Sequence, residues 1–339
     1  MGRVATGQVG EANETGRKRW LALYGPIAAE LAAAEKVLRE QLVSDDPFVD
    51  SLVKHAFRLG GKRLRPALLL ATAQAAGGVQ PEHIILSAVV EMIHTATLVH
   101  DDVLDEATLR RHRETINARC DNEVSVLVGD FLFTHSFFLA SSLPTTYGCR
   151  AIGHATNVVC AGELRQIHSR GNFALTEGEY LDIIDAKTAE LCACCCRLGA
   201  HYAGASPDVE ESLERYGRSL GIAFQIADDL LDVLGDERTA GKSLGTDLEK
   251  QKPTLPVIRL LAKASVARRE PLLALLRSGV ADARAQVLEA LRRSDALDYA
   301  REKALVYSRQ ACEELDCLPP GPARDLLMQL TQLVVSRRE

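Results

Sequence analysis

The chain has 339 residues, a hydrophobic fraction of 47%, a net charge of −6 and nine cysteines. This hydrophobic fraction is ordinary for a globular protein with a core. The mild negative charge argues against a nucleic-acid-binding surface, which is normally basic. No uninterrupted apolar run approaches the roughly 18 residues that cross a bilayer, so we expect no transmembrane segment.

Residues 1–19 are polar and show no periodicity, which predicts a disordered N-terminal tail. The tail has no apolar stretch typical of a signal peptide. Its basic residues are accompanied by Glu11 and Glu14, whereas mitochondrial transit peptides are poor in acids. An odd number of cysteines in a chain too long to need disulfides favours a reducing compartment. We therefore expect a cytoplasmic protein, with a mitochondrial one as the less favoured alternative.

Beyond Trp20, apolar residues recur at spacings of three and four, as on one face of an α-helix. Alternating patterns typical of strands are scarce. We expect the principal helices over residues 84–109, 124–143, 150–169, 177–203, 207–234, 255–264, 270–277, 281–293, 296–315 and 322–335. The sequence thus predicts an all-α fold, with one domain over residues 20–339. The polar stretch 235–256 is predicted to be a long loop, and such loops are often functional.

Two acidic clusters share the pattern Asp-Asp-X-Leu-Asp, and both lie in apolar helical context. They consist of Asp101, Asp102 and Asp105, and of Asp228, Asp229 and Asp232. On a helix the three carboxylates of each cluster share one face, where their repulsion is costly without compensation. Mg²⁺ supplies that compensation and also binds phosphate oxygens. A single cluster is most often a solvated acidic face, but the duplication favours a metal site that holds a diphosphate.

Basic residues accompany both clusters. Residues 60–66 read Gly-Gly-Lys-Arg-Leu-Arg-Pro, and Arg110-Arg111 follows the first acidic cluster. Arginine binds phosphate through two hydrogen bonds, lysine acts as a point charge, and glycine allows the backbone to approach closely. Lys187, Lys242 and Lys252 lie near the second cluster in sequence. Each of these cations alone is by default a surface charge, so the interpretation depends on their occurring together.

Taken in order, these motifs resemble those of the trans-isoprenyl diphosphate synthases, or polyprenyl synthetases. The resemblance covers about residues 50–260 and is nearest to the long-chain octaprenyl and solanesyl types. It is carried by Gly60-Gly-Lys-Arg-Leu-Arg-Pro66, Glu91-Met-Ile-His94, His100-Asp-Asp102, Leu109-Arg-Arg111, Val128-Gly-Asp130, Lys187-Thr-Ala189, Gly221-Ile-Ala-Phe-Gln225-Ile-Ala-Asp-Asp229, Gly241-Lys-Ser-Leu-Gly-Thr-Asp247 and Lys252-Pro-Thr-Leu-Pro256.

The resemblance implies a helical bundle with a central active-site cavity, a homodimer, and three Mg²⁺ ions per site held by the two acidic clusters. It also implies two substrates, isopentenyl diphosphate and an allylic diphosphate such as farnesyl or geranylgeranyl diphosphate. The residues it assigns to isopentenyl diphosphate are Lys62, Arg63, Arg65, His94 and Arg111. Those it assigns to the allylic diphosphate are Arg110, Lys187, Lys242 and Lys252.

Within the same family pattern, Thr188 and Gln225 would lie beside the developing allylic cation. With Asp101, Asp102, Lys187 and Asp228 they complete the expected catalytic set. Metals and cations stabilise the departing diphosphate, and water must be excluded from the cation, for which the 235–256 loop is a candidate lid. The sequence departs from the family at His112-Arg113-Glu114, where Gly-Lys-Pro is usual, and at Gln251, where glycine is common.

Product length is predicted from the residues that precede the first acidic cluster. Ala96 lies five residues before Asp101, or about 7.5 Å along the helix, with Thr97 beside it. Short-chain members of the family usually place an aromatic residue there as a floor, whereas alanine leaves the path of the growing chain open. We therefore expect an all-trans product of C30–C50.

Several alternatives are weighed against this interpretation. A C15 or C20 synthase is disfavoured by Ala96, and a non-catalytic subunit of a heteromeric synthase by the two intact acidic clusters. A terpene cyclase would have a different second metal motif, and a membrane aromatic prenyltransferase would have transmembrane helices. His100-Asp101 lacks the further residues of an HD phosphohydrolase. Cys192, Cys194, Cys195 and Cys196 have no partner pair at zinc-site spacing, so we expect them to be packing residues.

Overall fold

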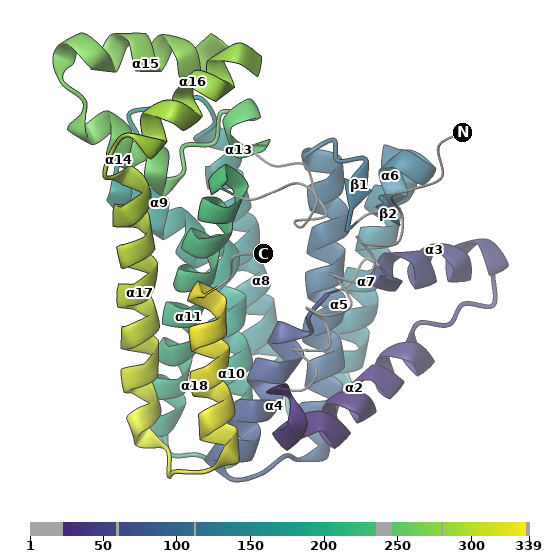
Figure 1. Ribbon diagram of the computed structural model, residues 1–339. Coiled ribbons are helices and arrows are strands. Elements are labelled where there is room, and N and C mark those ends of the chain that lie inside the picture. Colours follow the sequence, from purple (N-terminus) through teal and green to yellow (C-terminus); the bar gives the residue numbers. More distant parts are fainter. Residues whose placement is uncertain (1–22, 59–60, 112, 235–245, 279–280, 337–339) are drawn as a thin grey trace, which may run out of the picture. The chain divides into compact units, whose positions relative to one another are not determined.

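The structure, a computed structural model, describes residues 23–58, 61–111, 113–234, 246–278 and 281–336 (Figure 1). It is almost entirely helical, which confirms the predicted all-α fold. The predicted tail, residues 1–19, lies outside the described residues. The described residues form two compact units, and the expectation of a single domain stays a prediction.

Unit 1 contains the chain up to His154 together with Cys194–Glu214 and Cys317–Gln329. Helix α5 is its central element and packs against α2, α4 and α7. Figure 1 shows α5 and α7 side by side. The elements up to the start of α8 are η1 (Gly25–Ile27), α2 (Ala28–Gln41), α3 (Pro47–Arg58), α4 (Leu64–Ala76), α5 (Pro81–Leu104), β1 (Leu109–Arg110), β2 (Arg113–Glu114), α6 (Ile116–Arg119), α7 (Asn122–Ser141) and α8 (Tyr147–His168).

Helix α5 begins and ends at identifiable signals. Pro81 occupies the first turn, where its missing N–H is not needed. Gln80 caps the helix, and its backbone N–H donates to His83 Nδ1 at 2.7 Å. The helix ends at Leu104, so the expected extension to residue 109 was wrong. The reason is local: Glu106 has a positive φ of 49°, which the helix cannot continue through, and the chain turns into the hairpin.

The hairpin of β1 and β2 was not expected from the sequence. Leu109 pairs with Glu114 and Arg110 with Arg113 in antiparallel register. Strands of two residues are too short to show an alternating pattern, so the absence of such a pattern could not exclude them. The hairpin places Arg110 and Arg111 next to the end of α5.

Unit 2 contains Ala155–Ala193, Arg215–Asp316 and the chain from Leu330. The chain passes between the units within α8, α10, α11, η3 and α18. The elements after α8 are α9 (Glu177–Ile184), η2 (Asp185–Ala189), α10 (Glu190–Tyr202), α11 (Pro207–Leu234), α13 (Thr246–Glu249), α14 (Leu255–Lys263), α15 (Val266–Ser278), α16 (Ala281–Arg292), α17 (Ala296–Glu314), η3 (Leu315–Cys317) and α18 (Pro322–Val335).

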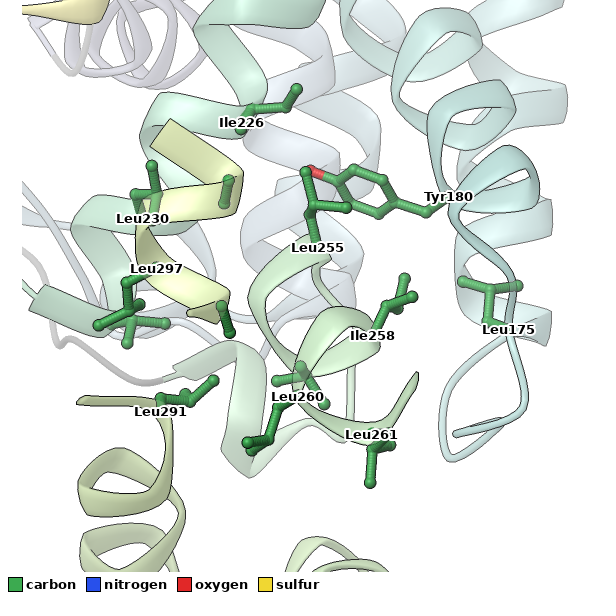
Figure 2. Packing of buried hydrophobic residues seen from close by; sticks show 14 of the residues in the cluster. Leu175, Tyr180, Ile226, Leu230, Leu255, Ile258, Leu260, Leu261, Leu291 and Leu297 are labelled. Carbon is green, nitrogen blue, oxygen red and sulfur yellow. The ribbon is translucent and has the colours of Figure 1, made fainter. Parts of the chain in front are cut away.

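The core of unit 2 is formed by leucine and isoleucine side chains of α9, α11, α14 and α17. In Figure 2, Tyr180 of α9 lies among them, beside Leu255 and near Ile226. The segment η2 is a five-residue π-helical turn between α9 and α10. The sequence predicted one continuous helix over 177–203, because a single wider turn does not interrupt the apolar pattern. Such turns are rare and often occur at functional sites.

Two helices, α5 and α7, are long and apolar enough to cross a membrane by length and composition alone. In the apolar window of α5, 67% of the residues are buried within the protein, as in a core helix, whereas in α7 the share is 39%. The expected absence of a transmembrane segment therefore stays a prediction.

Candidate functional site

The first acidic cluster lies at the C-terminal end of α5 in unit 1. Asp102 is buried, and its Oδ1 accepts hydrogen bonds from Nε and Nη2 of Arg110, both at 2.8 Å. Asp101 is half-buried, and Asp105 caps the helix rather than continuing it. The three carboxylates are therefore not equivalent. Asp102 is fixed by an arginine of the hairpin, whereas Asp101 and Asp105 are more accessible.

A basic cluster surrounds His94, two turns earlier on α5. Burial lowers the pKa of His94 well below its ordinary value of 6.5, and the guanidinium groups of Arg65, Arg111, Arg110 and Arg63 lower it further. The imidazole is therefore neutral at physiological pH. The four guanidinium groups place positive charge around this half-buried residue, although Arg63 and Arg110 also pair with carboxylates, and an anion such as diphosphate requires such a site.

The loop before α4 contributes the other predicted ligands. Arg65 Nε is buried and has no hydrogen-bond partner among the described residues, which marks it as a donor available to an anion. Tyr24 Oη donates to the Lys62 carbonyl oxygen at 2.7 Å, which fixes the backbone of the loop. A Cβ atom at Gly61 would overlap the guanidinium group of Arg111, so only glycine leaves room for Arg111 against this loop. The structure thus brings Lys62, Arg65, His94 and Arg111 together within unit 1.

Arg63 has a different environment from its neighbours. It lies in the left-handed region with a φ of 53°, and its Nη1 donates to Glu91 Oε1 at 2.5 Å. Its Nε lies 3.5 Å from Glu35 Oε1. The Glu91 side chain is only 2% exposed, so Arg63 neutralises a buried carboxylate. Its predicted role as a substrate ligand stays a prediction, and these contacts assign it the role of fixing the loop against α5.

The second acidic cluster lies near the end of α11 in unit 2, with Asp229 pointing into the protein. Asp229 Oδ2 accepts from Tyr180 Oη at 2.7 Å, and Oδ1 accepts from Gln225 Nε2 at 2.8 Å. Burial and the negative charge of Asp247 raise the pKa of Asp229 from 3.8 to about 8. Asp232 is buried and accepts from the backbone N–H of Asp247 at 3.3 Å, whereas Asp228 is half-buried.

The π-helical turn η2 carries Lys187 and Thr188. Lys187 Nζ donates to Gln166 Oε1 at 2.7 Å and forms an ion pair with Glu163, both on α8. Thr188 Oγ1 donates to Gln225 Oε1 at 2.8 Å. Gln225 therefore accepts from Thr188 and donates to Asp229, so its amide has one favoured orientation. The predicted pair Thr188–Gln225 is a direct contact within unit 2.

Lys252 follows α13. Its backbone N–H donates to the Asp247 carbonyl oxygen at 2.8 Å, and its Nζ lies 3.8 Å from Asp247 Oδ1. This places a predicted diphosphate ligand beside an acid that also faces the second cluster. Lys242, another predicted ligand, and His112 lie outside the described residues, as does most of the predicted lid.

The family model for polyprenyl synthetase matches residues 46–293. This chain belongs to the polyprenyl synthetase family. The all-trans-nonaprenyl-diphosphate synthase (geranyl-diphosphate specific) of Rhodobacter capsulatus is 37% identical, over 93% of this chain and 97% of that protein. The octaprenyl diphosphate synthase of Escherichia coli is 35% identical, over 91% and 96%. A polyprenyl synthase from Caulobacter crescentus, solved with calcium and isoprenyl diphosphate, has a TM-score of 0.89 at 35% identity, over 94% and 97%.

These relatives confirm the prediction of a trans-isoprenyl diphosphate synthase of the long-chain type. Among the described residues of this polyprenyl synthetase, no three His, Cys, Asp or Glu side chains converge as a ready-made metal site. Mg²⁺ typically takes one or two carboxylates, several waters and substrate phosphates rather than an all-protein cage. The half-buried carboxylates of Asp101 and Asp105 in unit 1 fit a metal held in that way, and so, separately, does that of Asp228 in unit 2.

The remaining residues that the sequence singled out are Ala96, Thr97, the four cysteines of α10 and His100. Ala96 is fully buried on α5, and Thr97 Oγ1 donates to the His94 carbonyl oxygen at 2.9 Å. Cys192, Cys194, Cys195 and Cys196 are all buried on α10, in agreement with a packing role. His100 Nε2 lies 3.3 Å from Asp130 Oδ1 and 3.2 Å from the Val126 carbonyl oxygen.

The sequence analysis missed several residues of this polyprenyl synthetase that contact the predicted ligands. Tyr180 binds Asp229, Glu91 binds Arg63, and Glu163 binds Lys187. Glu163 follows Gly162, where a Cβ atom would lie 2.7 Å from the Lys187 backbone nitrogen. The pattern Gly-Glu-X-X-Gln over 162–166 on a helix was a signal for this close approach, because glycine in a helix interior otherwise costs stability.

Proposed function

We propose that this protein is a Mg²⁺-dependent trans-polyprenyl diphosphate synthase that joins isopentenyl diphosphate to an allylic diphosphate and extends the chain to C30–C50. The observation that carries the proposal is the arrangement on α5. His94, at the centre of the arginine cluster, lies seven residues before Asp101, which is about 10.5 Å along one face of the helix. The same helix would therefore contribute to two sites: one around His94 that binds a diphosphate without metal, and one at Asp101 that binds a diphosphate through metal.

The basic cluster binds isopentenyl diphosphate. Arg65 offers its buried Nε, Arg111 and Lys62 supply charge, and neutral His94 can donate a hydrogen bond. This diphosphate is not cleaved in the first condensation step. Direct binding by cations, without a metal, suits a group that must only be held in place.

The acidic clusters and Arg110, Lys187, Lys242 and Lys252 serve the allylic diphosphate. In unit 1, Asp101 and Asp105 of the first acidic cluster would bind Mg²⁺, and in unit 2 Asp228 of the second cluster would do the same. When bound, the metal neutralises the charge that develops on the leaving diphosphate. The Caulobacter relative was solved with calcium and isoprenyl diphosphate, which supports a divalent cation here. Arg110 already contacts Asp102, so it can reach a diphosphate beside that carboxylate.

Thr188 and Gln225 stabilise the allylic cation. When the allylic C–O bond breaks, its electron pair leaves with the diphosphate and a cation remains. The double bond of isopentenyl diphosphate then forms the new C–C bond, and the released diphosphate accepts the proton whose loss gives the new allylic double bond. Thr188 Oγ1 donates its proton to Gln225, so its lone pairs remain available to face the positive charge. The buried apolar side chains of η2 and α11 help to exclude water.

Purified protein with isopentenyl diphosphate, Mg²⁺ and a geranyl, farnesyl or geranylgeranyl primer tests the function. We expect incorporation that is abolished by EDTA and, on chromatography, products of C30–C50. A main product of C15 or C20 would support the short-chain alternative. No incorporation with any primer would support the non-catalytic subunit alternative.

We further propose a cytoplasmic homodimer. Helix α7 exposes three large apolar side chains, Val126, Leu127 and Phe138, and the last two are 66% and 69% exposed. Apolar patches of this kind often mark protein–protein interfaces. Burial of α7 by a second copy of the chain would also explain why this helix is so apolar.

A further inference from the structure

Arg218 of α11 joins the two ends of the π-helical turn η2. Its Nη1 donates to Asp185 Oδ1 and its Nη2 donates to Glu190 Oε2, both at 2.7 Å. The same two residues are joined by the backbone, because the Glu190 N–H donates to the Asp185 carbonyl oxygen. One guanidinium group thus bridges the side chains of the two residues whose backbone hydrogen bond closes the turn.

The π-helical turn sets the direction of Lys187 and Thr188. It contains one residue more than an α-helical turn would, and each residue of an α-helix adds about 100° of rotation. If the segment relaxed to a regular α-helix, Lys187 and Thr188 would change direction relative to α10 by an angle of that order. Lys187 would then lose its place beside Gln166, and Thr188 its contact with Gln225.

Glycine residues on two neighbouring helices leave room for the π-helical turn, which is wider than an α-helical one. A Cβ atom at Gly221 of α11 would lie 2.5 Å from Ala189 Cα, and one at Gly162 of α8 would lie 2.7 Å from the Lys187 nitrogen. The close packing defines where the turn lies. Arg218 adds a side-chain connection between the two ends, beside the backbone hydrogen bond that closes the turn.

The ion pairs of Arg218 have the burial and the geometry needed to hold the two ends of the turn together. The Glu190 side chain is only 10% exposed and that of Arg218 is 32% exposed, so the pair is partly shielded from water. The planar fork of arginine can bind two separate carboxylates, whereas lysine acts as a point charge. Arg218 also lies seven residues before Gln225, on the same face of α11. One face of α11 therefore contacts both ends of the turn and, through Gln225, its Thr188.

We propose that Arg218 is a positioning residue for prenyl transfer, which holds the π-helical turn so that Lys187 and Thr188 face the allylic substrate. The proposal rests on the proposed function of Lys187 and Thr188. Arg218 itself is not assigned any contact with substrate.

The test compares Arg218→Met with Arg215→Met. Arg215 lies one turn earlier on α11 and forms a two-bond pair with Glu314 of α17, at 2.9 and 3.0 Å. We expect Arg218→Met to lower kcat by about ten- to a hundredfold, as misplacement of reacting groups does, and to raise the KM for the allylic substrate. The KM for isopentenyl diphosphate should not change, because its ligands lie in unit 1. Hydrogen exchange of amides 185–193 should be faster, and Arg218→Lys should recover part of kcat.

Arg215→Met should leave kcat and exchange at 185–193 unchanged, even where its melting temperature falls as much. Wild-type kcat in Arg218→Met, or an equal loss of kcat in both variants, would overturn the proposal. If Arg218→Met does not fold, Asp185→Asn removes one of the two ion pairs, and its kcat and exchange decide in the same way. A wild-type protein that is inactive with every primer would instead contradict the proposed function, and the exchange comparison would still show whether Arg218 holds the turn.

Discussion

The Tyr180 hydroxyl donates a 2.7 Å hydrogen bond to Asp229, an acid that burial and the nearby Asp247 hold at a pKa of about 8. A folded-state pKa raised above the ordinary 3.8 means that the folded protein binds this proton more tightly than the unfolded chain does. The free energy of unfolding of the metal-free protein should therefore fall as the pH rises from about 4 to about 8.

Thermal melts in EDTA at several pH values within that range test this prediction. Asp229→Asn should flatten the decline, whereas Asp182→Asn, at an exposed position on α9, should not. Metal binding requires ionised carboxylates, so the rise in melting temperature on adding Mg²⁺ should grow with pH. A wild-type slope equal to that of Asp229→Asn would show that Asp229 is ionised in the folded protein.

Neutral His94 predicts that binding of isopentenyl diphosphate takes up protons. The positive charges of four arginines help to hold its pKa below 6.5. A bound diphosphate partly cancels those charges, so the pKa rises toward its ordinary value. Calorimetry with isopentenyl diphosphate alone at pH 6.5, in two buffers of different ionisation enthalpy, should detect the uptake.

The uptake should be smaller in His94→Asn. His135→Asn is the matched control, since burial alone lowers the pKa of His135 and its ring nitrogen lies 3.3 Å from Gln41. The same uptake in wild type and His94→Asn would assign the proton to another group.

The sequence predicted the helices well where apolar periodicity and end signals agree. Helix α11 was expected over 207–234 and α18 over 322–335, and both have those bounds. Pro207 and Pro322 at the helix starts explain the agreement. The π-helical turn and the end of α5 were missed. The first does not disturb the apolar pattern, and the second depends on the left-handed backbone of Glu106.

The sequence predicted which residues would serve as substrate ligands, but not which other residues each of them contacts. The sequence placed Arg63 and Arg65 together, and only the structure separates them: Arg63 pairs with buried Glu91, whereas Arg65 keeps a buried donor without a hydrogen-bond partner among the described residues. The reason is that neighbouring side chains around a helix start point in different directions. Which of them meets a carboxylate depends on α5, distant in sequence.

Gly61→Ala should weaken binding of isopentenyl diphosphate. The added Cβ would overlap the Arg111 guanidinium and displace it from the loop of Lys62. We expect the KM for isopentenyl diphosphate to rise by about tenfold, equivalent to the loss of one charge-assisted hydrogen bond, with little change in the allylic KM. Gly25→Ala, where a Cβ atom meets nothing within 4 Å, is the control. Equal KM values in the two variants would contradict the assigned contact.

Phe138→Glu should dissociate the proposed homodimer. Its side chain is exposed on α7, and a charge there would have to be desolvated in an interface. Sedimentation velocity should show a dimer for wild type and a monomer for the variant. Val266→Glu changes an apolar residue of α15 that is even more exposed, at 88%, and this variant should remain dimeric. A wild-type protein that sediments as a monomer would contradict the homodimer. The apolar face of α7 would then be assigned to another partner, such as a membrane surface.

Ala96→Phe should shorten the product. Ala96 is fully buried on α5, five residues before Asp101. On the proposed path of the growing chain, a phenyl ring at this position would take up space that the chain needs. Overpacking of a core costs about 1–3 kcal/mol, and melting temperatures would establish that the variant folds. We expect the main product to fall from C30–C50 to C20 or below on chromatography, and Ala96→Val to give an intermediate shift. An active Ala96→Phe enzyme with unchanged products would mean that the chain grows along a path that does not pass Ala96.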